Sequence, residues 1–149
     1  MSRVVIVGAG QAGASCAIAL RRHGFVGDVI LAGAEAEAPY QRPPLSKAYL
    51  LGEMALDRLL LRPAEFYLEQ SIDLRLGVEA GEIDTAAQTV RLGDETLGYD
   101  HLVLATGAAP RMLPDAMTGG RTGLYVLRDA ADARRLAPEL VAGRRAFIV

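Results

Sequence analysis

The feature that most constrains the fold is a glycine-rich turn that directly follows a short apolar run near the start of the chain. Residues 4–7 are all β-branched, which is the pattern of a strand buried on both faces in a parallel sheet. The next residues read GAGQAG. Gly8 permits a tight bend, Gly10 lets the backbone approach a diphosphate, and Gly13 lets a helix pack closely on the strand. The pattern predicts a dinucleotide-binding turn; the alternative is a structural turn that binds no ligand.

The residues after this turn are typical of a helix followed by a second strand. The helix begins at Gln11, is rich in alanine, and ends with Arg21, Arg22 and His23 before Gly24. Cations favour the last turn of a helix, and glycine favours the position just beyond it. A second apolar run covers residues 29–32. Strand, glycine turn, helix and strand together predict a βαβ unit of a Rossmann-like α/β fold.

An acidic residue is expected where the second strand ends, because in this motif a carboxylate accepts the hydroxyls of the adenosine ribose. Glu35 is the first candidate and Glu37 the second; the alternative is that both are solvated loop carboxylates. No basic residue lies directly there, which argues against a nucleotide with a 2′-phosphate. The turn itself does not distinguish FAD from NAD, since both share an adenosine diphosphate end.

The rest of the chain predicts a mixture of loops, short helices and strands. Three prolines make residues 33–45 an irregular segment, after which Ser46 would cap a helix over residues 47–51. Pro63 would open another helix over residues 62–71. Alternation of apolar and polar residues predicts an antiparallel meander over residues 72–77, 79–85, 88–92 and 95–100. Further expectations are strands at 101–105, around Tyr125 and within 143–149, and a helix at 129–140.

Composition narrows the classes of partner and compartment. The chain has 149 residues and a net charge of −2, so no excess of positive charge favours nucleic acid or an anionic membrane surface. No apolar run reaches the length of a membrane helix. The single cysteine, Cys16, excludes a disulfide within the chain and favours the cytoplasm. We interpret Cys16 as an inert core residue, and His23 and His101 lack neighbours at metal-ligand spacing, so no metal site is predicted.

Two further stretches carry a resemblance to a known family. They read PYQRPPLSKAYL at residues 39–50 and LVLATGAAPR at residues 102–111, and YVLRDAADA at residues 125–133 supports them. The chain resembles the FAD-dependent ferredoxin and rubredoxin reductases of bacterial oxygenase systems. The resemblance implies a Rossmann-like three-layer FAD-binding domain, with a parallel sheet and a small antiparallel meander. It also implies that FAD, and not NAD, occupies the glycine turn.

The same resemblance implies a set of cofactor-binding residues and one catalytic residue. Lys47 matches a lysine whose ammonium lies beside the isoalloxazine ring, where positive charge stabilises the reduced flavin. The alternatives are an exposed lysine at position 47, a ligand-free arginine at position 128, and a simple turn at Thr106 and Gly107. Many members of the group have an acid where this chain has Ala34, which moves the expected ribose contact to Glu35. The expected cofactor-binding residues are Gly8, Gly10, Ala12, Gly13, Glu35, Arg42, Lys47, Ala80, Thr106, Gly107 and Arg128.

The function implied is transfer of electrons from NAD(P)H through FAD to a ferredoxin or rubredoxin-type iron–sulfur carrier. Residues 1–113 would form the N-terminal part of a FAD-binding domain, and residues 114–149 the connection and first strand of a truncated NAD(P)-binding domain. On this interpretation the chain is an incomplete part of a larger flavoprotein and is inactive when isolated, with the NAD(P)H site mostly outside it. The alternatives are the NADH-oxidising flavin subunit of a nitrite reductase and a non-catalytic nucleotide-binding module.

Overall fold

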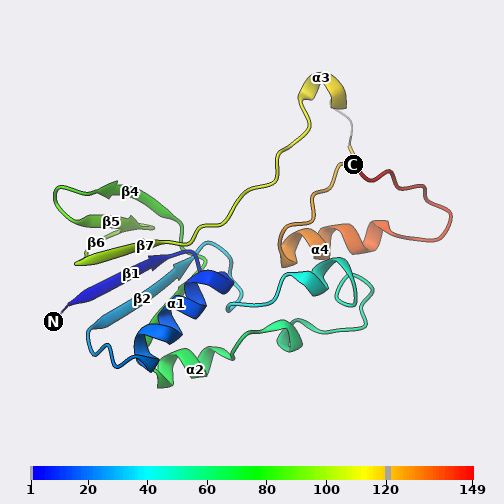
Figure 1. The fold of residues 1–149 in the computed structure, drawn as a ribbon. Coiled ribbons are helices and arrows are strands. Elements are labelled where there is room, and N and C mark those ends of the chain that lie inside the picture. Colours follow the sequence, from blue (N-terminus) through cyan, green and yellow to red (C-terminus); the bar gives the residue numbers. More distant parts are fainter. Residues whose placement is uncertain (1, 120–121) are drawn as a thin grey trace. The chain divides into compact units, whose positions relative to one another are not determined.

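The computed structural model describes residues 2–119 and 122–149, and the chain divides into two compact units (Figure 1). The first unit comprises residues 1–40 and 60–107, and the second comprises residues 41–59 and 108–149. Each unit therefore contains segments that lie far apart in the sequence.

The first unit is built on a parallel sheet whose strands end at one edge. Val7, at the end of the first strand, is level with Ala32 and Leu104 on its two neighbours. In a parallel sheet the residues that follow the strands meet at this carboxyl edge. The strand order is β3-β2-β1-β7, with β1 at Arg3–Val7, β2 at Asp28–Gly33, β3 at Ile72–Leu76 and β7 at His101–Leu104.

Two helices cover one face of this sheet, and a smaller antiparallel sheet covers the other (Figure 1). Val4 and Ile6 pack on the helix side, whereas Val5 and Val7 pack against the antiparallel strands. A strand buried on both faces has no polar alternation, which explains its uniformly apolar sequence. The three-layer α/β fold is thus confirmed. The covering elements are α1 (Gln11–Arg22), α2 (Ala64–Glu69), β4 (Ala80–Asp84), β5 (Thr89–Leu92) and β6 (Glu95–Gly98).

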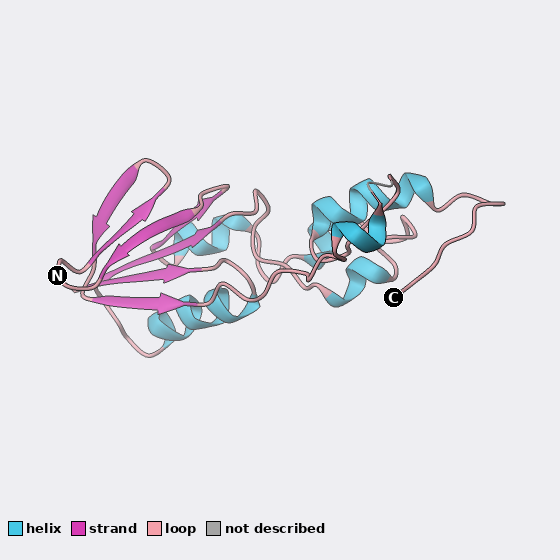
Figure 2. Ribbon diagram, turned by 90° about the horizontal axis from the view of Figure 1, so that it is seen from above, coloured by secondary structure: helices cyan, strands magenta, loops and turns pink. Residues whose placement is uncertain are grey.

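The described elements of the second unit are all helical (Figure 2). Its longest helix begins with Asp129 as N-cap, and the predicted helix over residues 129–140 is present, with a 3-10 turn at its end. The elements are the 3-10 helices η1 (Pro43–Ser46), η2 (Leu56–Leu59) and η3 (Ala137–Glu139), and the α-helices α3 (Asp115–Thr118) and α4 (Ala130–Leu136).

The prediction that residues 72–77 belong to the antiparallel meander is wrong. This segment forms β3, which pairs with β2 in parallel at the edge of the main sheet. Ile72 and Leu74 pack on the helix-side core, whereas Asp73 and Arg75 point to the opposite face, so the apolar and polar residues of β3 alternate as they do in a meander strand. The other three segments form the predicted meander, with the turn at Gly93 and Asp94.

Three further local predictions are wrong. Residues 47–51 form turns and not a helix, because the helical turn starts earlier, where Pro43 and Pro44 occupy the first positions of η1. No strand forms around Tyr125 or within residues 143–149. In the described part of the chain these two segments have no pairing strand, and their side chains are exposed, with Phe147 at 90%.

Candidate dinucleotide site

The glycine turn lies where β1, β2 and β7 end. The amide of Gly8 donates to the carbonyl of Ala32 at 2.8 Å, which joins the turn to the end of β2. Gly8 has a φ of +112°, a conformation that side chains disfavour. A Cβ atom at Gly8 would lie 2.2 Å from the carbonyl oxygen of Ala105, just beyond β7. Glycine at position 8 is therefore required by the chain itself.

Gly13 is also required by packing, because a Cβ atom there would lie 1.9 Å from the carbonyl oxygen of Gly8. Gly10 differs. Its φ of −83° and ψ of −169° are open to any residue, and a Cβ atom at this position would meet no atom within 4 Å. Neither conformation nor packing within the chain explains a glycine at position 10. A group that must come close to the backbone does explain it, so the turn fits a diphosphate.

Helix α1 presents its amino terminus at the same turn. Gly10 is the N-cap, no side chain caps the helix, and its first turn contains no acidic residue. The first amides of a helix have no acceptor in the helix, and they carry about half a positive charge. Ala12 is exposed in this first turn, so its small side chain leaves these amides accessible. The arrangement suits an anion such as a diphosphate.

Thr106 and Gly107 lie beside the turn at the end of β7. The amide nitrogen of Thr106 would be 2.9 Å from a Cβ atom on Gly8, and both Thr106 and Gly107 are exposed. Gly107 has a φ of +70° and redirects the chain out of the first unit. The structure therefore brings these two predicted residues next to the glycine turn.

Glu35 follows β2 and is half-buried, and its carboxylate accepts a hydrogen bond from the phenol of Tyr40. Its backbone carbonyl accepts from the amide of Gly77 at 2.9 Å, and Val78 donates to Gly33 at the same distance. These bonds hold the segment before Ala80 against the end of β2. Ala80 opens β4, so the predicted ribose and adenine positions lie on adjacent segments. Tyr40 was not predicted as a site residue.

The second unit contains the three remaining predicted residues, and it brings two of them together. The guanidinium of Arg42 donates to the backbone carbonyl of Arg128 at 2.6 Å. Both arginines line a hollow of about 300 Å³ in this unit. Its lining residues are Arg42, Pro43, Leu45, Ser46, Leu127 and Arg128.

Asp132 fixes the backbone at Arg128 and was missed as a supporting residue. Its buried carboxylate accepts from the amide of Arg128 at 2.8 Å and from the side chain of Arg135 at 2.5 Å. Burial alone would raise the pKa of this carboxyl group, but the bonds from Arg128, Arg135 and Asp129 together lower it below its usual value. The reciprocal spacing of Asp129 and Asp132 at the start of α4 was the available signal.

Lys47 is exposed, and its ammonium donates to the carbonyl of Pro43 at 3.3 Å. It stands at the C-cap of η1 and not in the first turn of a helix as expected. A cation is favourable at the carboxyl end of a helical turn. Its predicted catalytic role stays a prediction.

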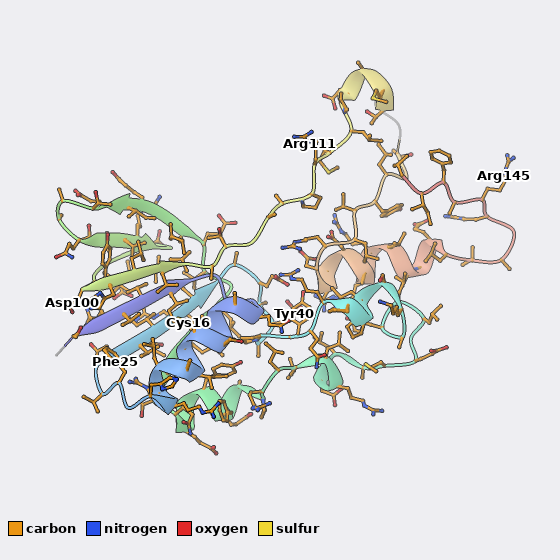
Figure 3. All side chains as sticks on the ribbon, viewed as in Figure 1. Cys16, Phe25, Tyr40, Asp100, Arg111 and Arg145 are labelled. Atoms are coloured by element: carbon orange, nitrogen blue, oxygen red, sulfur yellow. The ribbon has the colours of Figure 1, made fainter. Side chains whose placement is uncertain are left out.

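Among the described residues, the remaining cysteine, histidine and acidic side chains form no candidate metal site. Cys16, labelled in Figure 3, is partly buried and packs against the helix-side core. Among residues 2–119 and 122–149, no cluster of His, Cys, Asp and Glu is arranged to bind a metal. The same residues include no helix with the length and apolar character needed to span a membrane.

Comparison with known proteins shows the family of this chain. The model of a family described as pyridine nucleotide-disulphide oxidoreductase matches residues 2–149. The chain belongs to this family. A rhodocoxin reductase of Rhodococcus erythropolis is 46% identical over 92% of the chain and 32% of its own length. Putidaredoxin reductase of Pseudomonas putida is 40% identical over 98% of the chain and 35% of its own length.

Solved structures of related oxidoreductases have the same fold. A covalent putidaredoxin reductase–putidaredoxin complex gives a TM-score of 0.88 at 41% identity, covering 95% of this chain and 35% of that one. A ferredoxin reductase from Rhodopseudomonas palustris gives 0.85 at 37% identity, covering 93% and 34%. The chain thus spans about a third of the length of these relatives.

Proposed function

We propose that this protein takes electrons from NAD(P)H into a bound FAD and passes them to a ferredoxin or rubredoxin-type iron–sulfur carrier of an oxygenase system. The support is the family membership, together with relatives that are named rhodocoxin, putidaredoxin and rubredoxin reductases at 40–46% identity. The assignment of residues 1–113 to a FAD-binding domain and 114–149 to the approach to an NAD(P)-binding domain is part of this proposal, as is a cytoplasmic location.

The observation that carries the proposal is the open space at Gly10. The chain requires glycine at positions 8 and 13 for its own packing, but it does not require one at position 10. A diphosphate that approaches the exposed amides of α1 supplies the missing reason. The proposal therefore rests on the space beside the backbone of Gly10, which the rest of the described chain leaves open to a diphosphate.

In this proposal, different residues of the chain bind different parts of FAD. The amides at the start of α1 would hold the diphosphate, Glu35 would accept the adenosine ribose hydroxyls, and the backbone at Ala80 would face the adenine. Thr106 and Gly107 bring backbone amides to the same cofactor. When bound, FAD supplies the ability to accept a hydride and to release single electrons.

The roles of the basic residues in the second unit rest on the sequence resemblance. Arg42 and Arg128 supply positive charge to the cofactor, and their shared hydrogen bond fixes one relative to the other. Lys47 supplies the ammonium that stabilises negative charge on the reduced ring, because a fixed cation raises the reduction potential of the group beside it.

The full-length protein that carries this chain, loaded with FAD, provides the direct test. It should show the absorbance of bound flavin, lose that colour when NADH or NADPH is added without oxygen, and regain it when oxidised ferredoxin or rubredoxin is supplied. A colourless protein that binds no added FAD would contradict the proposal. A flavin that bleaches but is not reoxidised by either carrier would contradict the proposed acceptor alone.

A further inference from the structure

The carboxylate of Glu35 does not stand alone at the end of β2. The phenol of Tyr40 donates a hydrogen bond to it, across a loop of only a few residues. Figure 3 labels Tyr40, which lies on the side of the sheet toward which β1 and β2 point. Tyr40 is 5% exposed, whereas Glu35 is only half-buried. A buried donor therefore holds a partly exposed carboxylate just beyond β2, the strand to which the glycine turn is bonded.

The backbone fixes the position of this phenol. Tyr40 forms an isolated antiparallel bridge with Leu60, and the amide of Leu61 donates to the carbonyl of Pro39 at 2.8 Å. Pro39 is itself fully buried. These contacts anchor both sides of the residue, so the hydroxyl has little freedom to follow Glu35 if the carboxylate moves.

We infer that Tyr40 is a positioning residue, which orients the Glu35 carboxylate to accept the hydroxyls of the adenosine ribose. The inference rests on the proposed function, since it needs a dinucleotide at the glycine turn. A flexible glutamate loses side-chain entropy when it binds a ligand. Because the phenol already restricts the carboxylate, less of that entropy remains to be lost on binding.

The inference is tested with ribose analogues on the full-length protein that carries this chain. FAD binding is followed by flavin fluorescence, and ADP and 2′,3′-dideoxy-ADP are measured by competition with FAD. Tyr40→Phe should weaken ADP binding about tenfold, the size expected for losing a hydrogen bond to a charged group. Its binding of dideoxy-ADP, which has no ribose hydroxyls, should equal that of the wild type. Tyr99→Phe, a phenol removal in the other core, should change neither.

Two further variants separate positioning from folding. In a Glu35→Ala background, Tyr40→Phe should cost no further ADP affinity, because the carboxylate it orients is gone. Glu35→Asp keeps the charge but shortens the side chain by one methylene, so it should lose ADP affinity and keep dideoxy-ADP affinity. This variant leaves Tyr40 in place, so it replaces Tyr40→Phe in the binding test if Tyr40→Phe does not fold.

Different binding results would overturn the role of Tyr40 and the proposed function. Equal ADP binding by the wild type and by Tyr40→Phe, or by Glu35→Asp where that variant serves, would overturn the inference. Equal losses for ADP and dideoxy-ADP would assign Tyr40 a structural role only and would also overturn it. If the full-length wild-type protein binds no FAD at all, the proposed function itself fails.

Discussion

Two tyrosines of the first unit differ in what their hydroxyl groups contact. The hydroxyl of Tyr40 donates to Glu35, whereas that of Tyr67 is fully buried and has no hydrogen-bond partner among the described residues. The Tyr67 ring packs in the helix-side core, where it meets Phe66 edge-on. A buried polar atom without a partner costs free energy, so the ring of Tyr67 stabilises the fold and its oxygen opposes that effect.

Tyr67→Phe should therefore leave the free energy of unfolding unchanged or raise it by about 1 kcal/mol at neutral pH. Chemical denaturation followed by circular dichroism measures this. A loss of stability greater than about 1 kcal/mol would mean that the hydroxyl has a partner, such as a buried water.

Tyr67 also makes the stability of the fold depend on pH in the alkaline range. Burial raises the pKa of Tyr67 above its usual value of 10.0, with the charge of Arg62 opposing the shift. A raised folded-state pKa stabilises the fold below the unfolded value and loses that contribution as pH rises through the folded value. The wild type should thus lose stability above about pH 10, and Tyr67→Phe should lose less over the same range.

At the scale of elements, the glycine turn contains one glycine that packing requires, Gly13, and one that packing does not require, Gly10. Gly13→Ala places a methyl group against the carbonyl of Gly8, and overpacking of this kind costs about 1–3 kcal/mol. Gly10→Asn places its side chain in open space at an N-cap, where asparagine is favoured.

Gly10→Asn should therefore keep the stability of the FAD-free chain and lose FAD affinity, while Gly13→Ala should lose stability first. Thermal unfolding without ligand and a FAD titration separate the two effects. Unchanged FAD affinity in Gly10→Asn would mean that no ligand approaches this position.

The start of α4 depends on Asp132. Its lowered pKa means that its contribution is present above the unfolded pKa, near 3.8, and is lost as pH falls through the folded value. Asp132→Ala should destabilise the chain by about 1–2 kcal/mol at neutral pH, as expected for losing one half of a capping box. It should also lose less stability than the wild type on acidification. Glu82→Gln, an exposed acid on β4, serves as control and should change neither measurement.

At the scale of the whole molecule, the two units carry different parts of the predicted site. The glycine turn, Glu35, Ala80, Thr106 and Gly107 belong to the first unit, whereas Arg42, Lys47 and Arg128 belong to the second. The first unit thus holds the residues assigned to the adenosine diphosphate end of the cofactor, namely the glycine turn, Glu35 and Ala80, together with the turn at Thr106 and Gly107 that is expected near the flavin.

This division predicts that ADP alone stabilises the chain and that FMN, which lacks the adenosine, does so weakly. A ligand at a hundred times its dissociation constant adds about 2.7 kcal/mol. Thermal shift with ADP, FMN and FAD measures the effect. Stabilisation by FMN equal to that by ADP would contradict the assignment.

The βαβ start of the chain and the glycine turn were predictable from sequence because local rules govern them. A β-branched run, three spaced glycines and a cationic helix end each act within a few residues. The place of residues 72–76 was not predictable, since an edge strand and a meander strand share one alternating pattern and differ only in their neighbours.

The sequence by itself determined the strand, turn and helix, because backbone preferences and burial patterns are written locally. The family resemblance implied the three-layer fold class. Only the tertiary structure decided which glycine is left unexplained by packing, that Tyr40 holds Glu35, and that Asp132 and Arg42 bind the two sides of the Arg128 backbone. The bond between Arg42 and Arg128 and the packing around the glycine turn depend on segments that come together on folding. The bonds of Tyr40 to Glu35 and of Asp132 to Arg128 join residues close in sequence, but they form only in the loop and cap conformations that the fold fixes.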